Sequence, residues 1–123
     1  MKKHPVVDAL QKAVKGLLYI SESDAPLEPF LWEDGGKLTE DKLLELAGIE
    51  EGTSVETETL ADFFRIVSKE DKPKFDALAK VLKEQLSGVK VYKIGDEAER
   101  QVYVVGKTSD GKWAGVKTSV VET

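Results

Sequence analysis

The chain of 123 residues contains no cysteine and a single histidine, His4. The absence of cysteine excludes thiol nucleophiles, disulfides and thiolate-ligated metal centres. A histidine-dependent triad or metal cluster would have to use a residue next to a chain end. No apolar run is long enough to cross a bilayer, and Asp8, Lys12 and Lys15 interrupt the start of the chain, so no signal-peptide core is present. We expect a cytoplasmic protein without membrane contact.

Nucleotide-binding and catalytic motifs are also missing. Gly35 and Gly36 precede Lys37 without the spacing of a phosphate-binding loop, and there is no HExxH, calcium-loop or GxSxG pattern. Catalysis would rest on carboxylates, hydroxyls or lysines, and a chain with 23 acidic residues offers many carboxylate pairs by chance. We therefore expect neither an enzyme nor a cofactor of the chain's own.

Charge is unevenly distributed along the chain. Residues 21–60 hold twelve acids and two bases, so this stretch has a charge of −10. The rest of the chain has a charge of +5, which gives the net charge of −5. An acidic surface repels nucleic acid and attracts a basic protein partner. A solvated acidic region without a partner explains the charge equally well. The length favours one domain, residues 1–123, and we expect a monomer when it is free and no direct contact with nucleic acid.

Four helices are expected from periodicity and capping signals. Their expected starts are Pro5, which suits a first turn, Thr39 and Thr59 as N-caps, and the segment around Asp71 and Pro73. The first helix carries apolar residues at helical spacing, and the others are expected to end near Gly48, Val67 and Gly88. The apolar positions of the first helix are Val6, Val7, Leu10, Ala13, Val14, Leu17 and Leu18.

The remaining segments read as loops and strands. Residues 19–26 are expected to form a loop, and residues 30–32 a short strand at a sheet edge because Pro29 limits pairing. Residues 89–94, 101–107 and 113–121 alternate like antiparallel strands, and Asp110-Gly111 predicts a hairpin between the last two. Helices first and sheet last predict an α+β layered domain with a mainly antiparallel sheet and a C-terminal three-strand meander. The expected core is Leu10, Val14, Phe30, Phe63, Phe64, Leu78, Leu82, Val91, Val102, Val104 and Val120, and we assign Trp32 and Trp113 to packing.

Two places concentrate unusual carboxylates. Ser21-Glu22-Ser23-Asp24 crowds acids and hydroxyls into a turn between apolar Tyr19-Ile20 and Pro26, which could present a rigid carboxylate or be a connector with local hydrogen bonds. The chain then ends on Val120-Val121-Glu122-Thr123 directly after a predicted strand. A terminal carboxylate with a reference pKa of about 3.3–3.7 is ionised at neutral pH, although most chain ends are frayed and idle.

At these places the sequence resembles the nuclease A inhibitor family. The similarity runs in order along nearly the whole chain, and its most specific part is the Ser-Glu-Ser turn before Phe-Leu-Trp-Glu, combined with the Val-Val-Glu-Thr end. The resemblance implies an α/β/α sandwich and one-to-one inhibition of a non-specific DNA/RNA endonuclease of the ββα-metal type. The matching segments are residues 16–23, Pro26, residues 30–33, Phe63-Phe64, Val91-Tyr92, Gly95, residues 102–106, Gly115 and residues 120–123.

The resemblance also implies roles for particular residues. Glu22 would ligate the nuclease's catalytic Mg²⁺, and the terminal carboxylate of Thr123 would reach the same ion through water. The rest of the expected nuclease-binding set is Ser21, Ser23, Asp24 and Glu122, while Glu33 and Asp34 could join Asp24 in facing the nuclease's basic residues. One departure from the family pattern is the segment 68–72, which lacks an aromatic and acidic insert, so part of the interface is expected to differ.

Two alternatives remain at this point. The same fold could be an acidic interaction module for another basic protein, which would bind without Mg²⁺ and without special dependence on Glu22. A carboxylate-dependent hydrolase would instead use Glu22 and Asp24 and lose turnover with either acid.

Overall fold

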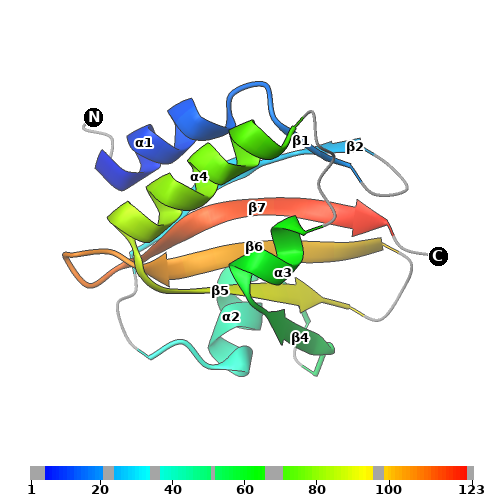
Figure 1. The fold of residues 1–123 in the computed structure, drawn as a ribbon. Helices are drawn as coiled ribbons and strands as arrows, with labels where there is room; N and C mark the ends of the chain where they lie inside the picture. The colour runs from blue at the N-terminus through cyan, green and yellow to red at the C-terminus, as the bar shows by residue number, and fades with distance from the viewer. Residues whose placement is uncertain are drawn as a thin grey trace.

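A computed structural model describes residues 5–20, 24–33, 37–50, 52–65, 71–95 and 99–121. Its centre is a five-stranded antiparallel sheet in the order β3-β7-β6-β5-β4 (Figure 1). The strands are β3 (Glu28–Trp32), β4 (Val55–Glu58), β5 (Ser87–Ile94), β6 (Glu99–Lys107) and β7 (Trp113–Val121). The α+β class and the C-terminal meander of β5, β6 and β7 are therefore confirmed.

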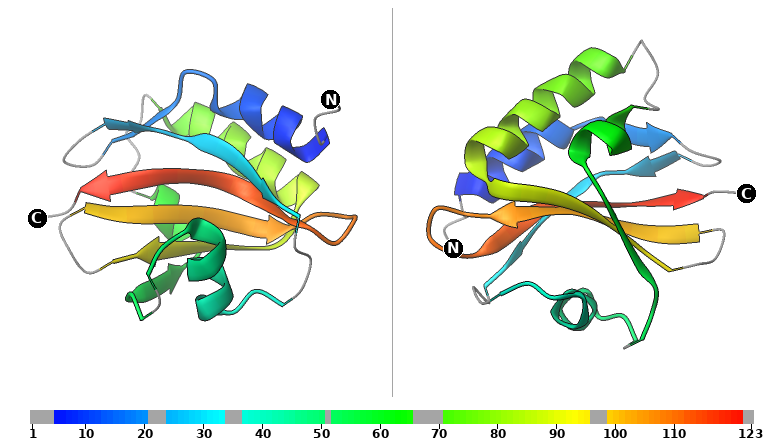
Figure 2. Two further views of the ribbon diagram at one scale, coloured as in Figure 1. Left: turned by 180° about the vertical axis from the view of Figure 1, so that it is seen from behind. Right: turned by 60° about the horizontal axis from the view of Figure 1, so that its bottom comes forward.

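Helices cover both faces of this sheet. Figure 2 shows α1 (Pro5–Val14), α3 (Leu60–Phe64) and α4 (Lys72–Gln85) on one face and α2 (Glu40–Ala47) on the other. Successive strand residues point to opposite faces, so Val102 and Val104 of β6 lie in the larger apolar cluster while Tyr103 lies in the smaller one beneath α2. The arrangement is an α/β/α sandwich with two apolar layers.

The predicted core is buried, with two exceptions. Phe30 and Phe64 are only half-buried. Phe30 lies on the edge strand β3 and packs on Trp32 and Tyr103, with ring centroids 4.6 and 5.5 Å away. Phe64 lies in the last turn of α3 and meets Phe75 edge-on at 5.1 Å. Both rings border the core and do not fill its centre.

The first helix is shorter than the sequence suggested. α1 ends at Val14, and Gly16 has a φ of 77°, a left-handed conformation that glycine adopts without steric cost. The prediction that Leu17 and Leu18 continue the helix is therefore wrong. The prediction of a loop over 19–26 is wrong for residues 19, 20 and 24–26, because β1 (Leu18–Ile20) and β2 (Asp24–Pro26) pair as antiparallel strands, while residues 21–23 lie outside the described residues.

The other helix starts agree with the capping signals. Thr39 Oγ1 accepts a hydrogen bond from the backbone N–H of Lys42, and Thr59 Oγ1 accepts one from Asp62, each at 3.1 Å. Gly48 ends α2 in the left-handed conformation.

Three boundaries differ from expectation or go untested. The predicted end of the α3 helix, Ile66 and Val67, lies outside the described residues. α4 ends at Gln85, before the predicted end near Gly88, since Ser87 and Gly88 belong to β5. The strand β4 was not predicted. Within the described part of the chain, no helix is long and apolar enough to span a membrane.

Candidate functional site

The β1–β2 hairpin is fixed to the core through Tyr19. Its pairs are Leu18 with Pro26, Tyr19 with Ala25 and Ile20 with Asp24. The Tyr19 ring is buried, stacks on Phe63 with centroids 4.3 Å apart and planes 7° from parallel, and its hydroxyl donates to the Phe63 carbonyl at 2.7 Å. A buried hydroxyl and carbonyl that satisfy each other hold β1 against α3.

The second strand of the hairpin is fixed to the sheet. Ala25 is buried, and its carbonyl oxygen accepts a hydrogen bond from Thr118 Oγ1 of β7 at 3.5 Å. The flanking residues Leu17 and Leu27 are also buried. Both strands of the hairpin are thus held where the chain enters and leaves it.

β7 is paired up to Val121, the last residue that the structure describes. Val120 is buried and pairs with Arg100, and Val121 pairs with Glu99. Only two residues follow Val121. β7 is therefore paired and partly buried up to Val121.

The register between β3 and β7 places the β1–β2 hairpin and the end of β7 at the same end of the sheet. β3 runs antiparallel to β7 with Glu28 opposite Lys117, so residues that precede Glu28 lie toward residues that follow Lys117. The contact between Ala25 and Thr118 agrees with this direction. In Figures 1 and 2 the ends of β1 and β7 and the start of β2 lie at the same end of the molecule. We call this end, marked by Ile20, Asp24 and Val121, the hairpin edge.

The predicted site residues themselves lie mostly outside the described part of the chain. This holds for Ser21, Glu22, Ser23, Glu122 and Thr123, and Asp24 is described only in its backbone, as the first residue of β2. Among the described residues there is no group of three or more histidine, cysteine or acidic side chains that could hold a metal ion. The predicted site therefore stays a prediction, and the described structure covers only the strands next to it.

Glu33 does not belong to the hairpin edge. It follows Trp32, which pairs with Trp113 at the start of β7 and thus at the opposite end of the sheet. The Glu33 carboxylate lies 2.8 Å from Lys112 Nζ, and this hydrogen bond raises the pKa of Lys112 above its ordinary value. Glu33 therefore lies at the other end of β7 from Asp24, and its expected contact with the nuclease stays a prediction, as does that of Asp34, which lies outside the described residues.

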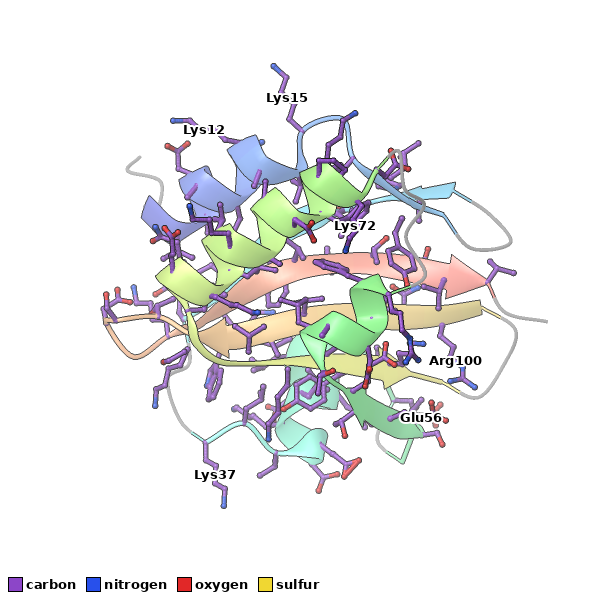
Figure 3. The ribbon with its side chains drawn as sticks, viewed as in Figure 1. Lys12, Lys15, Lys37, Glu56, Lys72 and Arg100 are labelled. Atoms are coloured by element: carbon purple, nitrogen blue, oxygen red, sulfur yellow. The ribbon has the colours of Figure 1, made fainter. Side chains whose placement is uncertain are left out.

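A group of alternating charges near the hairpin edge was missed by the sequence reasoning. Arg100 Nη1 donates to Glu56 Oε2 at 2.9 Å (Figure 3), and Lys93 Nζ lies 3.5 Å from Glu58 Oε1. Arg100 and Lys93 are 19% and 17% exposed, so both are largely covered by neighbouring atoms. Alternate residues of a strand point to the same face, so Arg100 lies on the same face of β6 as the buried Val102. This alternation could have predicted from the sequence that Arg100 is largely covered.

Comparison with known proteins identifies the family to which the chain belongs. The family model described as "Nuclease A inhibitor-like protein" matches residues 4–123, which covers both the hairpin and the end of the chain. The chain belongs to this family. A search of curated protein sequences found no match. Membership in the nuclease A inhibitor-like family covers the whole sandwich, including the hairpin edge.

Proposed function

We propose that this protein inhibits a sugar-non-specific DNA/RNA endonuclease of the ββα-metal type by placing two carboxylates at the nuclease's catalytic divalent ion. Glu22 ligates the ion directly, and the α-carboxylate of Thr123 reaches it through a bound water. The complex contains one inhibitor and one nuclease. The family assignment supports a nuclease as the partner.

The observation that carries this proposal is the meeting of two chain segments at the hairpin edge. Three residues separate Ile20 from Asp24, and two residues follow Val121, so Glu22 and Thr123 each lie two residues beyond a paired strand end. Two residues of extended chain span about 7 Å, a length that allows both carboxylates to approach one ion. The metal-binding mechanism requires this proximity.

The chemistry of the ion favours carboxylate occupation. Mg²⁺ prefers six oxygen ligands at about 2.0–2.1 Å and keeps several waters, so a carboxylate oxygen can take the place of a scissile phosphate oxygen while a second carboxylate binds a retained water. A side-chain carboxylate has no phosphodiester bond to cleave. Occupation of the site is therefore unproductive, and the protein acts as a substrate mimic.

The anchored hairpin and the charge of the chain both favour tight, fast binding. Tyr19 and Ala25 already hold β1 and β2 in place, so binding of the nuclease need not order these two strands. The surplus of acids in residues 21–60 attracts the basic groove with which a nuclease binds nucleic acid, and raises the association rate at low salt.

The direct test is inhibition of a purified ββα-metal nuclease acting on plasmid DNA with Mg²⁺. Glu22→Gln keeps the size of the side chain and removes its charge, and a short extension after Thr123 displaces the terminal carboxylate. We expect each change to weaken inhibition at least about 30-fold, the cost of truncating one member of a desolvated charge pair. Glu50→Gln is the matched control, because Glu50 is an exposed acid of the same acidic stretch, and it should change inhibition less than about fivefold.

The thermal unfolding temperature of every variant is measured alongside, so that loss of folding is separated from loss of contact. Equal, small effects of Glu22→Gln and Glu50→Gln in folded proteins would contradict the metal-binding proposal and favour an acidic interaction module. Cleavage that continues in an excess of the unmodified protein would remove the inhibitor proposal for that nuclease.

A further inference from the structure

A basic pocket lies at the opposite end of the sheet from the hairpin edge. It has a volume of about 380 Å³ and is formed where β5 and β7 begin, where β6 ends and where the chain approaches α2. The volume is within the range of small-molecule sites, about 300–1,000 Å³. We call it the lysine pocket, and its lining residues are Lys37, Leu38, Gly88, Lys90, Tyr92, Val105, Lys107 and Trp113.

The lysine pocket concentrates positive charge on an acidic protein. Lys37, Lys90 and Lys107 line it, all three are exposed, and no lining residue is acidic. Lys37 projects into solvent from the segment that precedes α2 (Figure 3), so its long side chain is free to turn toward a bound group. A local charge of this sign attracts an anion even though the chain as a whole is negative.

These lysines differ from most others in the described part of the chain. Six described lysines approach carboxylates within 4 Å, whereas the three in the pocket, like Lys15, Lys74, Lys83 and Lys117, form no ion pair with a described residue. The paired lysines are Lys12, Lys42, Lys72, Lys80, Lys93 and Lys112. The positive charge of the pocket is therefore available to a ligand.

The rest of the lining suits a flat ring. Val105 is buried, Tyr92 and Trp113 are half-buried, and they form the apolar floor with Leu38. Lys107 Nζ lies 5.5 Å from the centroid of the Trp113 ring, a cation–π contact that positions the ammonium without neutralising its charge. The Tyr92 hydroxyl can donate a hydrogen bond, and burial, followed by the nearby negative charge of Glu40, raises its pKa further above neutral.

The local backbone opens this part of the sheet. The register between β5 and β6 shifts between Ser87 and Lys90, and Gly88 has a φ of 62°. Such a bulge re-aims the side chains beside it and is common next to binding sites. Here the two residues at the bulge, Gly88 and Lys90, both line the pocket.

We propose that the lysine pocket binds a mononucleotide, with its phosphate held by Lys37, Lys90 and Lys107 and its base against Tyr92, Val105 and Trp113. Three ammonium groups around an uncharged floor match a ligand that carries its charge at one end and a planar ring at the other. The acidic remainder of the chain disfavours a long polyanion, so a free nucleotide is preferred over a nucleic-acid strand. The pocket and the hairpin edge lie at opposite ends of β7, so both can be occupied together.

The experiment titrates the full chain with adenosine monophosphate, adenosine, inorganic phosphate and a short oligonucleotide bearing a terminal phosphate. Amide and indole NMR signals report where each ligand binds, and calorimetry gives its affinity. We expect adenosine monophosphate to shift the Trp113 indole signal saturably and to bind more tightly than either adenosine or phosphate. Its binding should weaken as salt is added.

The decisive variant is the pair Lys90→Gln and Lys107→Gln. We expect it to weaken binding of adenosine monophosphate about tenfold, the combined effect of two exposed charge contacts. The matched control is Lys74→Gln with Lys83→Gln on α4, two exposed lysines without a described ion-pair partner, and it should change the affinity less than about twofold. Nuclease inhibition should be the same for both variants.

Three results would overturn the proposal. They are shifts that map away from the lysine pocket, equal affinity for adenosine and adenosine monophosphate, and unchanged affinity in the folded Lys90 and Lys107 variant. An oligonucleotide that binds at least as tightly, with the same dependence on both lysines, would contradict the preference for a free nucleotide.

Discussion

The hydrogen bond from the Tyr19 hydroxyl to the Phe63 carbonyl can be tested with a single-atom change. Tyr19→Phe removes the hydroxyl and keeps the ring that stacks on Phe63 and meets Phe75 edge-on at 6.2 Å. Because Tyr19 and Phe63 are 2% and 1% exposed, water cannot replace the lost donor without disturbing the packing. The carbonyl oxygen then has no hydrogen-bond donor among the described residues.

The expected cost follows from that burial. An unsatisfied buried carbonyl lowers the free energy of unfolding by about 1–3 kcal/mol. For a domain of this length, each kcal/mol lowers the unfolding temperature by about 4 °C. Loss of the anchor also frees β1 next to the Ser21–Ser23 segment, so inhibition should weaken by a smaller factor than in Glu22→Gln.

Calorimetry and urea denaturation followed by circular dichroism measure this effect. Tyr92→Phe is the matched control, because the Tyr92 hydroxyl has no hydrogen-bond partner among the described residues, and it should stay within about 0.5 kcal/mol of the parent protein. If Tyr19→Phe were as stable as Tyr92→Phe, the hydroxyl would not anchor the hairpin and the argument for a fixed loop base would fail.

Three further changes test the fold around the site. Gly115→Ala would bring a Cβ within 1.7 Å of the Val104 carbonyl oxygen, so we expect a loss of about 3 kcal/mol or more, and an unchanged unfolding temperature would contradict the close approach. Thr39→Ala removes the cap of α2 and should cost about 1 kcal/mol by urea denaturation; no loss would show that the cap is dispensable. Burial raises the pKa of Tyr103, as burial and then Glu40 do for Tyr92, so these phenols hold protons that the unfolded chain releases. Their contribution to stability is complete below about pH 10 and falls as the pH rises beyond it, and urea denaturation at alkaline pH should detect this fall. In the variant with both Tyr92→Phe and Tyr103→Phe, the loss of stability at alkaline pH should be smaller.

The parts of the fold that could be predicted are those with strong local signals. Thr39 and Thr59 cap their helices as their chemistry suggests, and the alternation of β5, β6 and β7 reflects one face packed under α1 and α4 and the other toward α2. These elements are specified by residues close together in the sequence.

The parts that could not be predicted depend on distant contacts. Leu17 and Leu18 continue the apolar period of α1, and only the left-handed Gly16 and the contact of Tyr19 with Phe63, 44 residues away, make the next segment a strand. β4 carries Glu56 and Glu58, which form ion pairs with Arg100 of β6 and Lys93 of β5, so its polar sequence lacks the usual strand signal.

The candidate site also has parts that the sequence predicts and parts that depend on distant contacts. The turn at Glu22 and the chain end at Thr123 stand out in the sequence through their residue types and through the family resemblance. Their supports do not, because the link from Thr118 to Ala25 joins residues 93 positions apart and depends on the register of β3 with β7. The lysine pocket was likewise hidden, since Lys37, Lys90 and Lys107 come from three separate segments.

The most direct test of the central claim is a thermodynamic cycle that combines Glu22→Gln with removal of the divalent ion. Calorimetry measures the affinity of the parent protein and the variant for the nuclease, each with Mg²⁺ and with a chelator. If Glu22 ligates the ion, either change alone should weaken binding at least about 30-fold, and the second should then add little because the same contact is already lost. Fully additive effects, or an affinity of the parent protein that does not depend on Mg²⁺, would contradict the claim that the inhibitor binds through the catalytic metal.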